Sequence, residues 1–198
     1  MELYLIRHGE STWNRDDRVQ GQSNPCLSEK GKKQAELLKN RLSGISFDFV
    51  YSSHLRRAYD TAKISFDGRY KIERDKRLSE INLGVWEGIS AKKLFKESGE
   101  FRSWFEKTSE ITPENGESLF EFRDRVISFF NELMKNKKEK KGLIFTHSGV
   151  IGIFLAHFLE MNLNKVWSIP TSNGSITIVN MTNPFFTLIT FNDTSHLV

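Results

Sequence analysis

Two short apolar runs, at residues 3–6 and 142–146, constrain the fold of this chain more than any other feature of its sequence. A nearly continuous apolar run of this length favours a strand covered on both faces, as in a parallel sheet. Helical spacings of apolar residues lie between such runs, and this alternation predicts helices on both sides of one sheet. We therefore expect an α/β fold, a three-layer αβα sandwich with a mostly parallel central sheet.

Further elements follow from the remaining pattern. It predicts strands at residues 47–51, 70–73, 175–180 and 185–191, and helices that begin near Ser28, Leu55, Ser118 and Val150. Ser118 and Glu121 have the spacing of a capping box. The last two predicted strands are separated by residues 182–184, which indicates an antiparallel hairpin at one edge of the sheet. We expect one domain over residues 1–198, with residues 78–114 as an insertion that covers an end of the sheet.

Charge and composition narrow the partners. The net charge of +4 and a pI near 9.1 suit a protein that attracts an anionic small molecule. Residues 135–141 are lysines except Asn136 and Glu139, and we interpret this run as a solvated helix end. It contains no aromatic residue on which bases could stack, so we expect no nucleic acid partner. The expected partner is a small phosphorylated metabolite, bound by a monomer or a homodimer.

Cys26 is the single cysteine, which excludes a disulfide within the chain and a cysteine zinc cluster. The first residues enter a strand pattern at once and do not resemble a signal peptide. No apolar run approaches the length that crosses a bilayer. We expect a cytoplasmic protein that has no membrane partner.

The two apolar runs end at similar residues. His8 follows the first run between Arg7 and Gly9, and His147 follows the second. Ligands of open α/β sheets bind beyond the carboxyl ends of the strands, so both imidazoles are expected in one crevice. Arg7 and Arg57 would add guanidiniums there, which match phosphate oxygens. A neutral imidazole can act as a nucleophile, and neighbouring cations favour its neutral form.

A histidine can also have a structural role or bind a metal. A lone histidine at a strand end is more often structural than catalytic, and we interpret His54, His157 and His196 in that way. A metal site would need ligand spacings such as H-x-x-x-H, which the sequence lacks, and nearby arginines would repel a cation. We expect neither a metal nor a cofactor.

Several stretches resemble the motifs of one known family. They are LIRHGESTWN at residues 5–14, QG at 20–21, LSEKG at 27–31, SSHLRRA at 52–58, LSEINLGVWEG at 78–88, NGES at 115–118, THSG at 146–149 and NDTSHL at 192–197. Together they are similar to the histidine phosphatase superfamily, which includes the cofactor-dependent phosphoglycerate mutases. The resemblance extends along the whole chain and implies a phosphoglycerate mutase-like fold.

The resemblance also implies roles for individual residues. His8 matches the nucleophile that becomes phosphorylated, and Glu80 matches the proton donor to the leaving oxygen. The positions that match the phosphate pocket and its loop are Arg7, Asn14, Gln20, Gly21, Arg57, His147 and Ser148. Glu87 is a second carboxylate in the same motif, and its place after Trp86 favours a structural role. Cys26 and Asn24 depart from the family, where proline and aspartate are common.

The segment after Glu80 separates two branches of the family. Mutases of the family carry a segment of the type Glu-Arg-His-Tyr-Gly after the acid. The segment EINLGVWEG at residues 80–88 instead resembles that of the small phosphatases, which include α-ribazole phosphatase and broad-specificity phosphatases. We therefore expect a phosphoric monoester hydrolase, with α-ribazole 5′-phosphate and phosphoserine among the candidate substrates. A 2,3-bisphosphoglycerate-dependent phosphoglycerate mutase and a non-catalytic domain that binds phosphorylated ligands stay as alternatives. The insertion aromatics Phe101, Trp104 and Phe105 are expected to pack its interior, and contact with a ribosyl base is the alternative.

Overall fold

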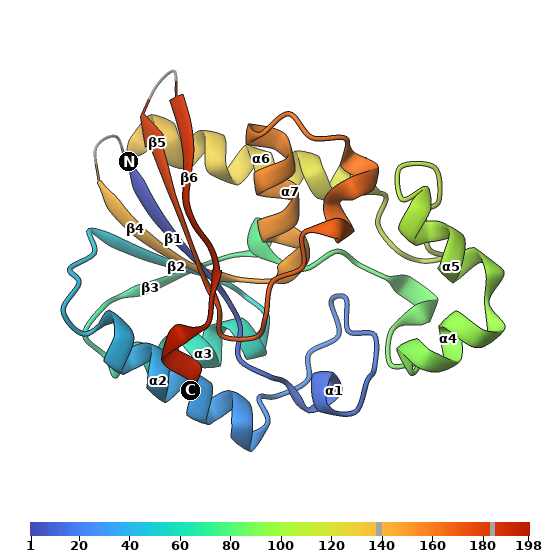
Figure 1. The fold of residues 1–198 in the computed structure, drawn as a ribbon, viewed down its shortest axis with the longest axis horizontal. Helices are drawn as coiled ribbons and strands as arrows, with labels where there is room; N and C mark the ends of the chain where they lie inside the picture. The colour runs from blue at the N-terminus through green and yellow to red at the C-terminus, as the bar shows by residue number, and fades with distance from the viewer. Residues whose placement is uncertain (138–139, 183–184) are drawn as a thin grey trace.

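The computed structural model describes residues 1–137, 140–182 and 185–198. A six-stranded sheet lies between two layers of helices (Figure 1), which confirms the expected α/β sandwich. The strands are β1 (Glu2–Arg7), β2 (Phe49–Ser53), β3 (Ile72–Asp75), β4 (Lys141–Thr146), β5 (Ile176–Thr182) and β6 (Phe185–Asp193). Their order is β3-β2-β4-β1-β5-β6, and the first four run parallel. β5 is antiparallel to both β1 and β6, so the predicted hairpin forms one edge of the sheet.

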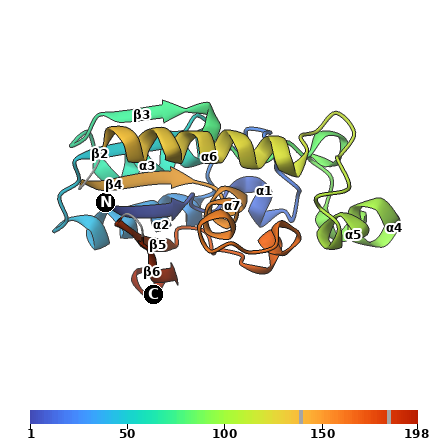
Figure 2. The ribbon, with the colours of Figure 1, turned by 90° about the horizontal axis from the view of Figure 1, so that it is seen from above.

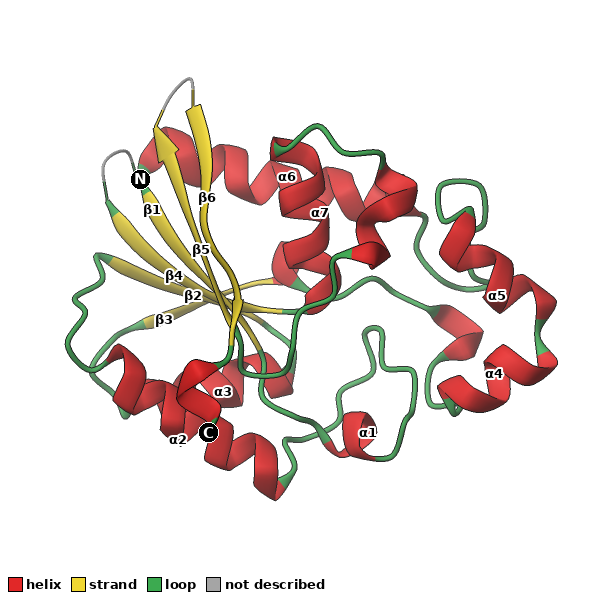
Figure 3. Ribbon diagram, viewed as in Figure 1, coloured by secondary structure: helices red, strands yellow, loops and turns green. Residues whose placement is uncertain are grey.

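The helices are α1 (Thr12–Arg15), α2 (Glu29–Leu42), α3 (Arg56–Phe66), α4 (Ala91–Glu97), α5 (Gly99–Glu106), α6 (Leu119–Asn136) and α7 (Ser148–Phe158), with short 3₁₀ helices η1 (Lys76–Leu78), η2 (Gly84–Trp86), η3 (Leu163–Ser168) and η4 (Ser195–Leu197). α2 and α3 cover one face of the sheet, and α6 and α7 cover the other (Figure 3). Ser28 caps α2 by accepting from the Gly31 amide, and Ser118 forms the predicted capping box with Glu121.

Alternating side chains of β1 fill two separate cores. Leu3 and Leu5 belong to the cluster under α6 and α7, whereas Tyr4 and Ile6 belong to the cluster under α2 and α3. Successive side chains of a strand point to opposite faces, so a continuous apolar run is what a doubly covered strand requires. The four residues are buried, with exposed fractions between 0% and 9%.

Some predicted element boundaries are displaced. β2 and β3 each begin two residues later than predicted, because Phe47 and Tyr70 serve the connections before them. The Phe47 amide donates to the Tyr70 hydroxyl at 3.2 Å, and the two rings lie edge to face. α7 begins at Ser148, directly after His147, and not at Val150.

The segment that contains η2, α4 and α5 extends past the carboxyl ends of the parallel strands (Figure 2). Trp86, Phe101 and Trp104 are each less than 5% exposed, and their rings pack edge to face around Trp86. Phe101 and Trp104 therefore fill the interior of this segment, as expected from the sequence.

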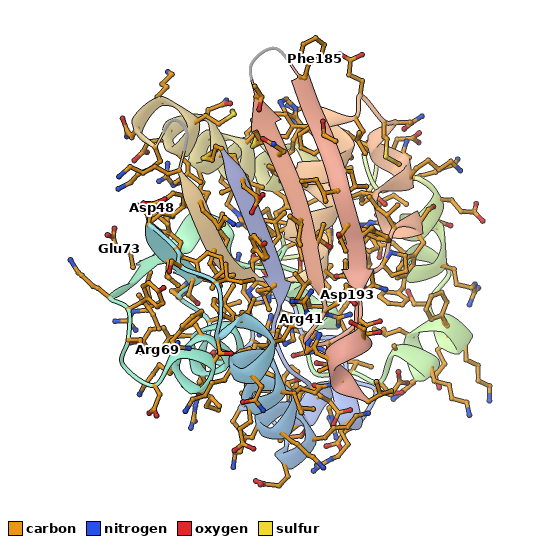
Figure 4. The ribbon with its side chains drawn as sticks, turned by 60° about the vertical axis from the view of Figure 1, so that its left-hand side comes forward. Arg41, Asp48, Arg69, Glu73, Phe185 and Asp193 are labelled. Atoms are coloured by element: carbon orange, nitrogen blue, oxygen red, sulfur yellow. The ribbon has the colours of Figure 1, made fainter. Side chains whose placement is uncertain are left out.

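At the edge formed by β6, the chain continues into η4, which packs against α2. Arg41 of α2 and Asp193 of β6 lie close together (Figure 4), with Nη2 and Oδ2 3.7 Å apart. The predicted turn at residues 182–184 and the lysine run at 135–141 each include residues outside the described ranges. No helix of the described chain is long and apolar enough to cross a membrane.

Candidate functional site

β1 and β4 are adjacent parallel strands, and their register brings the two predicted histidines together. Arg7 lies opposite Thr146, and the His8 amide donates to the Thr146 carbonyl at 3.0 Å. The rings of His8 and His147 are 5.1 Å apart between centroids. Both residues are buried, with exposed fractions of 3% and 0%. The carboxyl ends of two central strands thus deliver both imidazoles to one place, as the sequence predicts.

The hydrogen bonds of His8 define its tautomer. Nδ1 lies 2.7 Å from the Gly9 carbonyl oxygen, which can only accept, so Nδ1 carries the proton. Nε2 is then a lone-pair acceptor, and Arg57 Nε donates to it at 3.2 Å. Burial, with the charges of Arg57 and Arg7, holds the pKa of His8 well below its usual value. The ring is therefore neutral at neutral pH, with its lone pair on Nε2.

The His147 ring is held by the end of β2. Its Nε2 lies 2.9 Å from the Ser53 hydroxyl, which accepts from the Leu55 amide and can donate its own hydrogen to Nε2. When Ser53 donates in this way, the ring proton lies on Nδ1. Nδ1 is buried and has no hydrogen-bond partner within the described chain. Burial, with Arg57 nearby, also lowers the pKa of His147 well below its usual value.

The two predicted arginines lie around these rings. Arg57, on the first turn of α3, is 1% exposed and donates to His8 and to the carbonyls of Gly21 and Ser23 at 2.7 Å each. All three acceptors are uncharged. Burial lowers the pKa of Arg57 to about 10, so the guanidinium stays charged at neutral pH. Burial also lowers the pKa of Arg7, whose Nη1 donates to the Thr171 carbonyl.

Glu80 faces the start of α7. Its Oε2 accepts from the Gly149 amide at 3.1 Å, and its Oε1 accepts from the Ile81 amide at 3.0 Å. Gly149 is required there, because a Cβ atom at this position would lie 2.2 Å from Glu80 Oε1. The Glu80 charge also raises the pKa of both Arg7 and Arg57, which counters the effect of burial. The carboxylate is thus near the two guanidiniums without a direct ion pair.

The other predicted site residues belong to the hydrogen-bond network that holds His8, Arg57 and Arg7. The Ser11 hydroxyl lies 3.1 Å from Asn14 Oδ1 and donates to Gln20 Oε1 at 2.7 Å. Gly21 adopts a φ of 49° and presents its carbonyl to Arg57. Ser148 opens α7, and its hydroxyl accepts from the Thr171 amide at 3.2 Å. Asn173 donates both to the His8 carbonyl and to Asn14 Oδ1, so hydrogen bonds connect this group to His8.

Glu87 organises the loop that contains Gly21. Its carboxylate accepts from the amides of Gln22, Ser23 and Leu83 at 2.7–3.0 Å. These bonds place Glu87 beneath the loop, in agreement with the structural role expected for it.

Asn24 caps the start of α3 from a distant part of the chain. Its side-chain oxygen accepts from the Arg56 amide at 2.7 Å, and this bond replaces the one that the N-cap residue Leu55 has no side-chain acceptor to make.

The sequence did not single out several residues that hold the site. Thr61 accepts from the Gly9 amide at 3.0 Å, and Asn173 donates to the His8 carbonyl at 3.1 Å. Ser53 supports His147, and Thr171 supports Arg7. The Ser53 position, at the end of a predicted strand beside Arg57, was a usable signal. Thr171 and Asn173 lie in an irregular segment before β5 and carried none.

An ion pair beneath the site fixes the main chain at Glu80. Arg125 of α6 binds Glu117 through Nε and Nη2 at 2.6 and 2.8 Å. The same guanidinium donates to the carbonyls of Arg77, Ser79 and Glu80. Glu117 in turn accepts from the Asn82 amide at 3.2 Å. The pair therefore joins α6 to both sides of Glu80.

We expect Arg125→Met to lower the free energy of unfolding by about 2–3 kcal/mol, because it removes the cationic partner of the partly buried Glu117 carboxylate and one donor from each of three carbonyls. The side chains of Arg125 and Glu117 are only 20% and 14% exposed. Urea denaturation followed by circular dichroism measures the change. Arg56→Met is the matched control, since the Arg56–Asp60 pair is 61% and 31% exposed and should contribute little. Equal losses in the two variants would contradict the role assigned to Arg125.

Across the described residues, no group of three or more histidine, cysteine, aspartate or glutamate side chains is placed to hold a metal ion. The site instead combines neutral nitrogen bases, buried guanidiniums and a carboxylate beside a helix N-terminus. Such a set suits a tetrahedral oxyanion, because arginine donors and helix amides both favour negative charge.

Comparison with known proteins agrees with this geometry. The profile of the histidine phosphatase superfamily (branch 1) matches residues 3–194. Phosphoserine phosphatase 1 of Hydrogenobacter thermophilus is 34% identical and aligns with 100% of this chain and 94% of its own. Adenosylcobalamin/alpha-ribazole phosphatase of Escherichia coli is 30% identical over 97% of this chain and 96% of its own. The solved structure of Bacillus stearothermophilus YhfR has a TM-score of 0.93 at 32% identity, and covers 100% of this chain and 99% of its own.

Proposed function

Because the chain belongs to the histidine phosphatase superfamily, we propose that it hydrolyses small phosphate monoesters through a phosphohistidine on His8. One observation supports this most directly. Arg7 Nε and His147 Nδ1 are buried, and neither has a hydrogen-bond partner among the described residues. A buried polar atom that lacks a partner needs an explanation, and phosphoryl oxygens would satisfy both. Residues 1–198 then act as one histidine phosphatase domain, with the segment 78–114 as its cover.

The first step transfers the phosphoryl group to His8. A phosphoryl oxygen of the substrate accepts the hydrogen bond that Arg57 Nε otherwise donates to His8 Nε2. The lone pair on Nε2 is then free to attack phosphorus. The N–P bond forms while the P–O ester bond breaks. The Glu80 carboxylate takes up a proton when the substrate dianion binds beside it, because a like charge disfavours its ionised form, and it gives that proton to the departing oxygen. The Gly9 carbonyl accepts from Nδ1 and stabilises the charge that develops on the ring. Arg7, Arg57 and His147 bind the phosphoryl oxygens.

The second step returns the enzyme to its starting state. A water molecule gives a proton to the Glu80 carboxylate and attacks phosphorus as the N–P bond breaks. Inorganic phosphate leaves, and Glu80 releases the proton once that like charge is gone. The phosphatase names of the relatives support water as the acceptor. A mutase would instead return the phosphoryl group to an organic hydroxyl.

The test is to quench turnover of a radiolabelled monoester and to map the label. We expect label on the peptide that contains His8, stable in base and lost in acid, together with release of inorganic phosphate that exceeds any transfer to 3-phosphoglycerate. Phosphate transfer to that acceptor at a rate above hydrolysis would favour the mutase. Tight binding of the ester without label or product would favour the non-catalytic domain. Label on any other residue would also reject the mechanism.

A further inference from the structure

Trp167 lies beside the carboxylate that we assign as the acid. It is near the end of η3, the helical turn drawn in orange after α7 in Figure 1. A Cβ atom on Gly149 would lie 2.2 Å from Glu80 Oε1 and 3.1 Å from Trp167 Cη2. The carboxylate and the six-membered edge of the indole therefore flank the same point at the start of α7. No motif of the sequence drew attention to this residue.

The indole is held in a fixed orientation. Its Nε1 donates to the Thr108 hydroxyl at 3.0 Å, and that hydroxyl donates to the Trp104 carbonyl at 2.6 Å. Its ring lies 4.9 Å from the Trp104 ring, at an angle of 37°. Thr108 and Trp104 are 1% and 2% exposed, whereas Trp167 keeps part of its surface accessible. The polar end of the indole is thus anchored in the insertion, and its apolar edge is left toward Glu80.

We infer that Trp167 forms the wall against which the alcohol part of the substrate lies, and that the site selects esters of uncharged alcohols with an apolar or flat group next to the ester oxygen. The inference rests on the proposed function. A general acid must lie within hydrogen-bond reach of the oxygen that it protonates, so the leaving alcohol lies beside Glu80 and hence beside Trp167. A rigid aromatic edge favours carbon groups there and offers no hydrogen-bond donor or acceptor to the ammonium or carboxylate of a charged substituent.

Steady-state kinetics with benzyl phosphate and phosphoserine test this. We expect the wild-type enzyme to have the higher kcat/KM for benzyl phosphate. Trp167→Ala should lower that value roughly tenfold, mainly through KM, and should change the value for phosphoserine far less. Trp167→Phe should restore most of the preference, because it keeps an aromatic edge. Phe120→Ala is the control, since Phe120 is a 45% exposed aromatic at the start of α6.

The outcomes separate the inference from the function beneath it. Equal losses for both esters in Trp167→Ala would mean that the ring only supports the fold, and would overturn the inference while hydrolysis itself stands. A wild-type preference for phosphoserine would overturn it as well. Absence of phosphate release from both esters in the wild-type enzyme would reject the proposed function and the inference together.

Discussion

Replacing His8 by alanine is expected to lower kcat/KM for every phosphate ester by roughly 10,000-fold or more, because it removes the nucleophile rather than a binding group. Alanine leaves no lone pair beneath the phosphorus atom, so no N–P bond can form. The arginines stay in place, and the variant should still bind inorganic phosphate. Phosphate release from p-nitrophenyl phosphate, measured beside isothermal titration with inorganic phosphate, separates chemistry from binding.

The matched control for His8 is a histidine outside the site. His157 lies on the last turn of α7 and is exposed, so His157→Ala should retain full activity. His8→Ala should still unfold in one cooperative transition, at a urea concentration below that of the wild-type enzyme, because it leaves a cavity and removes an acceptor of the buried Arg57. Wild-type turnover in a folded His8→Ala enzyme would show that another residue accepts the phosphoryl group.

The sheet and the core of the site could be predicted because local patterns carry them. The apolar runs that became β1 and β4 each end at a histidine, and the rule that ligands bind beyond the carboxyl ends of strands placed His8 beside His147. Arg57 followed from its place just inside a helix after a strand. In each case, one residue's position relative to its own element decides where its side chain goes. The expectation that His8 lies beside His147 assumes that β1 and β4 are neighbouring parallel strands, and the observed register confirms this pairing.

The parts that could not be predicted depend on contacts between distant segments. Arg125 serves the Glu80 main chain 45 positions away, and Asn173 reaches the His8 carbonyl across 165 positions. Neither residue has a local pattern that distinguishes it from a surface arginine or a loop asparagine. Trp167 belongs with them, since its neighbours Thr108 and Gly149 come from two other parts of the fold. Such roles follow only from the packed structure.

We expect Glu80→Gln to slow the hydrolysis of alkyl phosphates by about 100- to 10,000-fold and that of p-nitrophenyl phosphate by less than about tenfold. An alkoxide is a poor leaving group and needs a proton in the transition state, whereas p-nitrophenolate leaves readily without one. Glutamine keeps the size of the side chain and, through its carbonyl, one acceptor for the amides of Gly149 and Ile81. A plot of kcat/KM against the acidity of the leaving alcohol, for both enzymes, measures the difference in slope.

Glu87→Gln is the control for the slope of kcat/KM against the acidity of the leaving alcohol. Glu87 is a carboxylate a few residues away, and it holds the loop of Gln22 and Ser23 instead of facing the ester. Its loss should disturb the Arg57 pocket and reduce activity toward alkyl and aryl esters by the same factor, so the two plots should run parallel. If Glu80→Gln behaves in this parallel way too, then its carboxyl does not protonate the leaving oxygen. A steeper dependence in Glu80→Gln alone is the result that only a proton donor at this position produces.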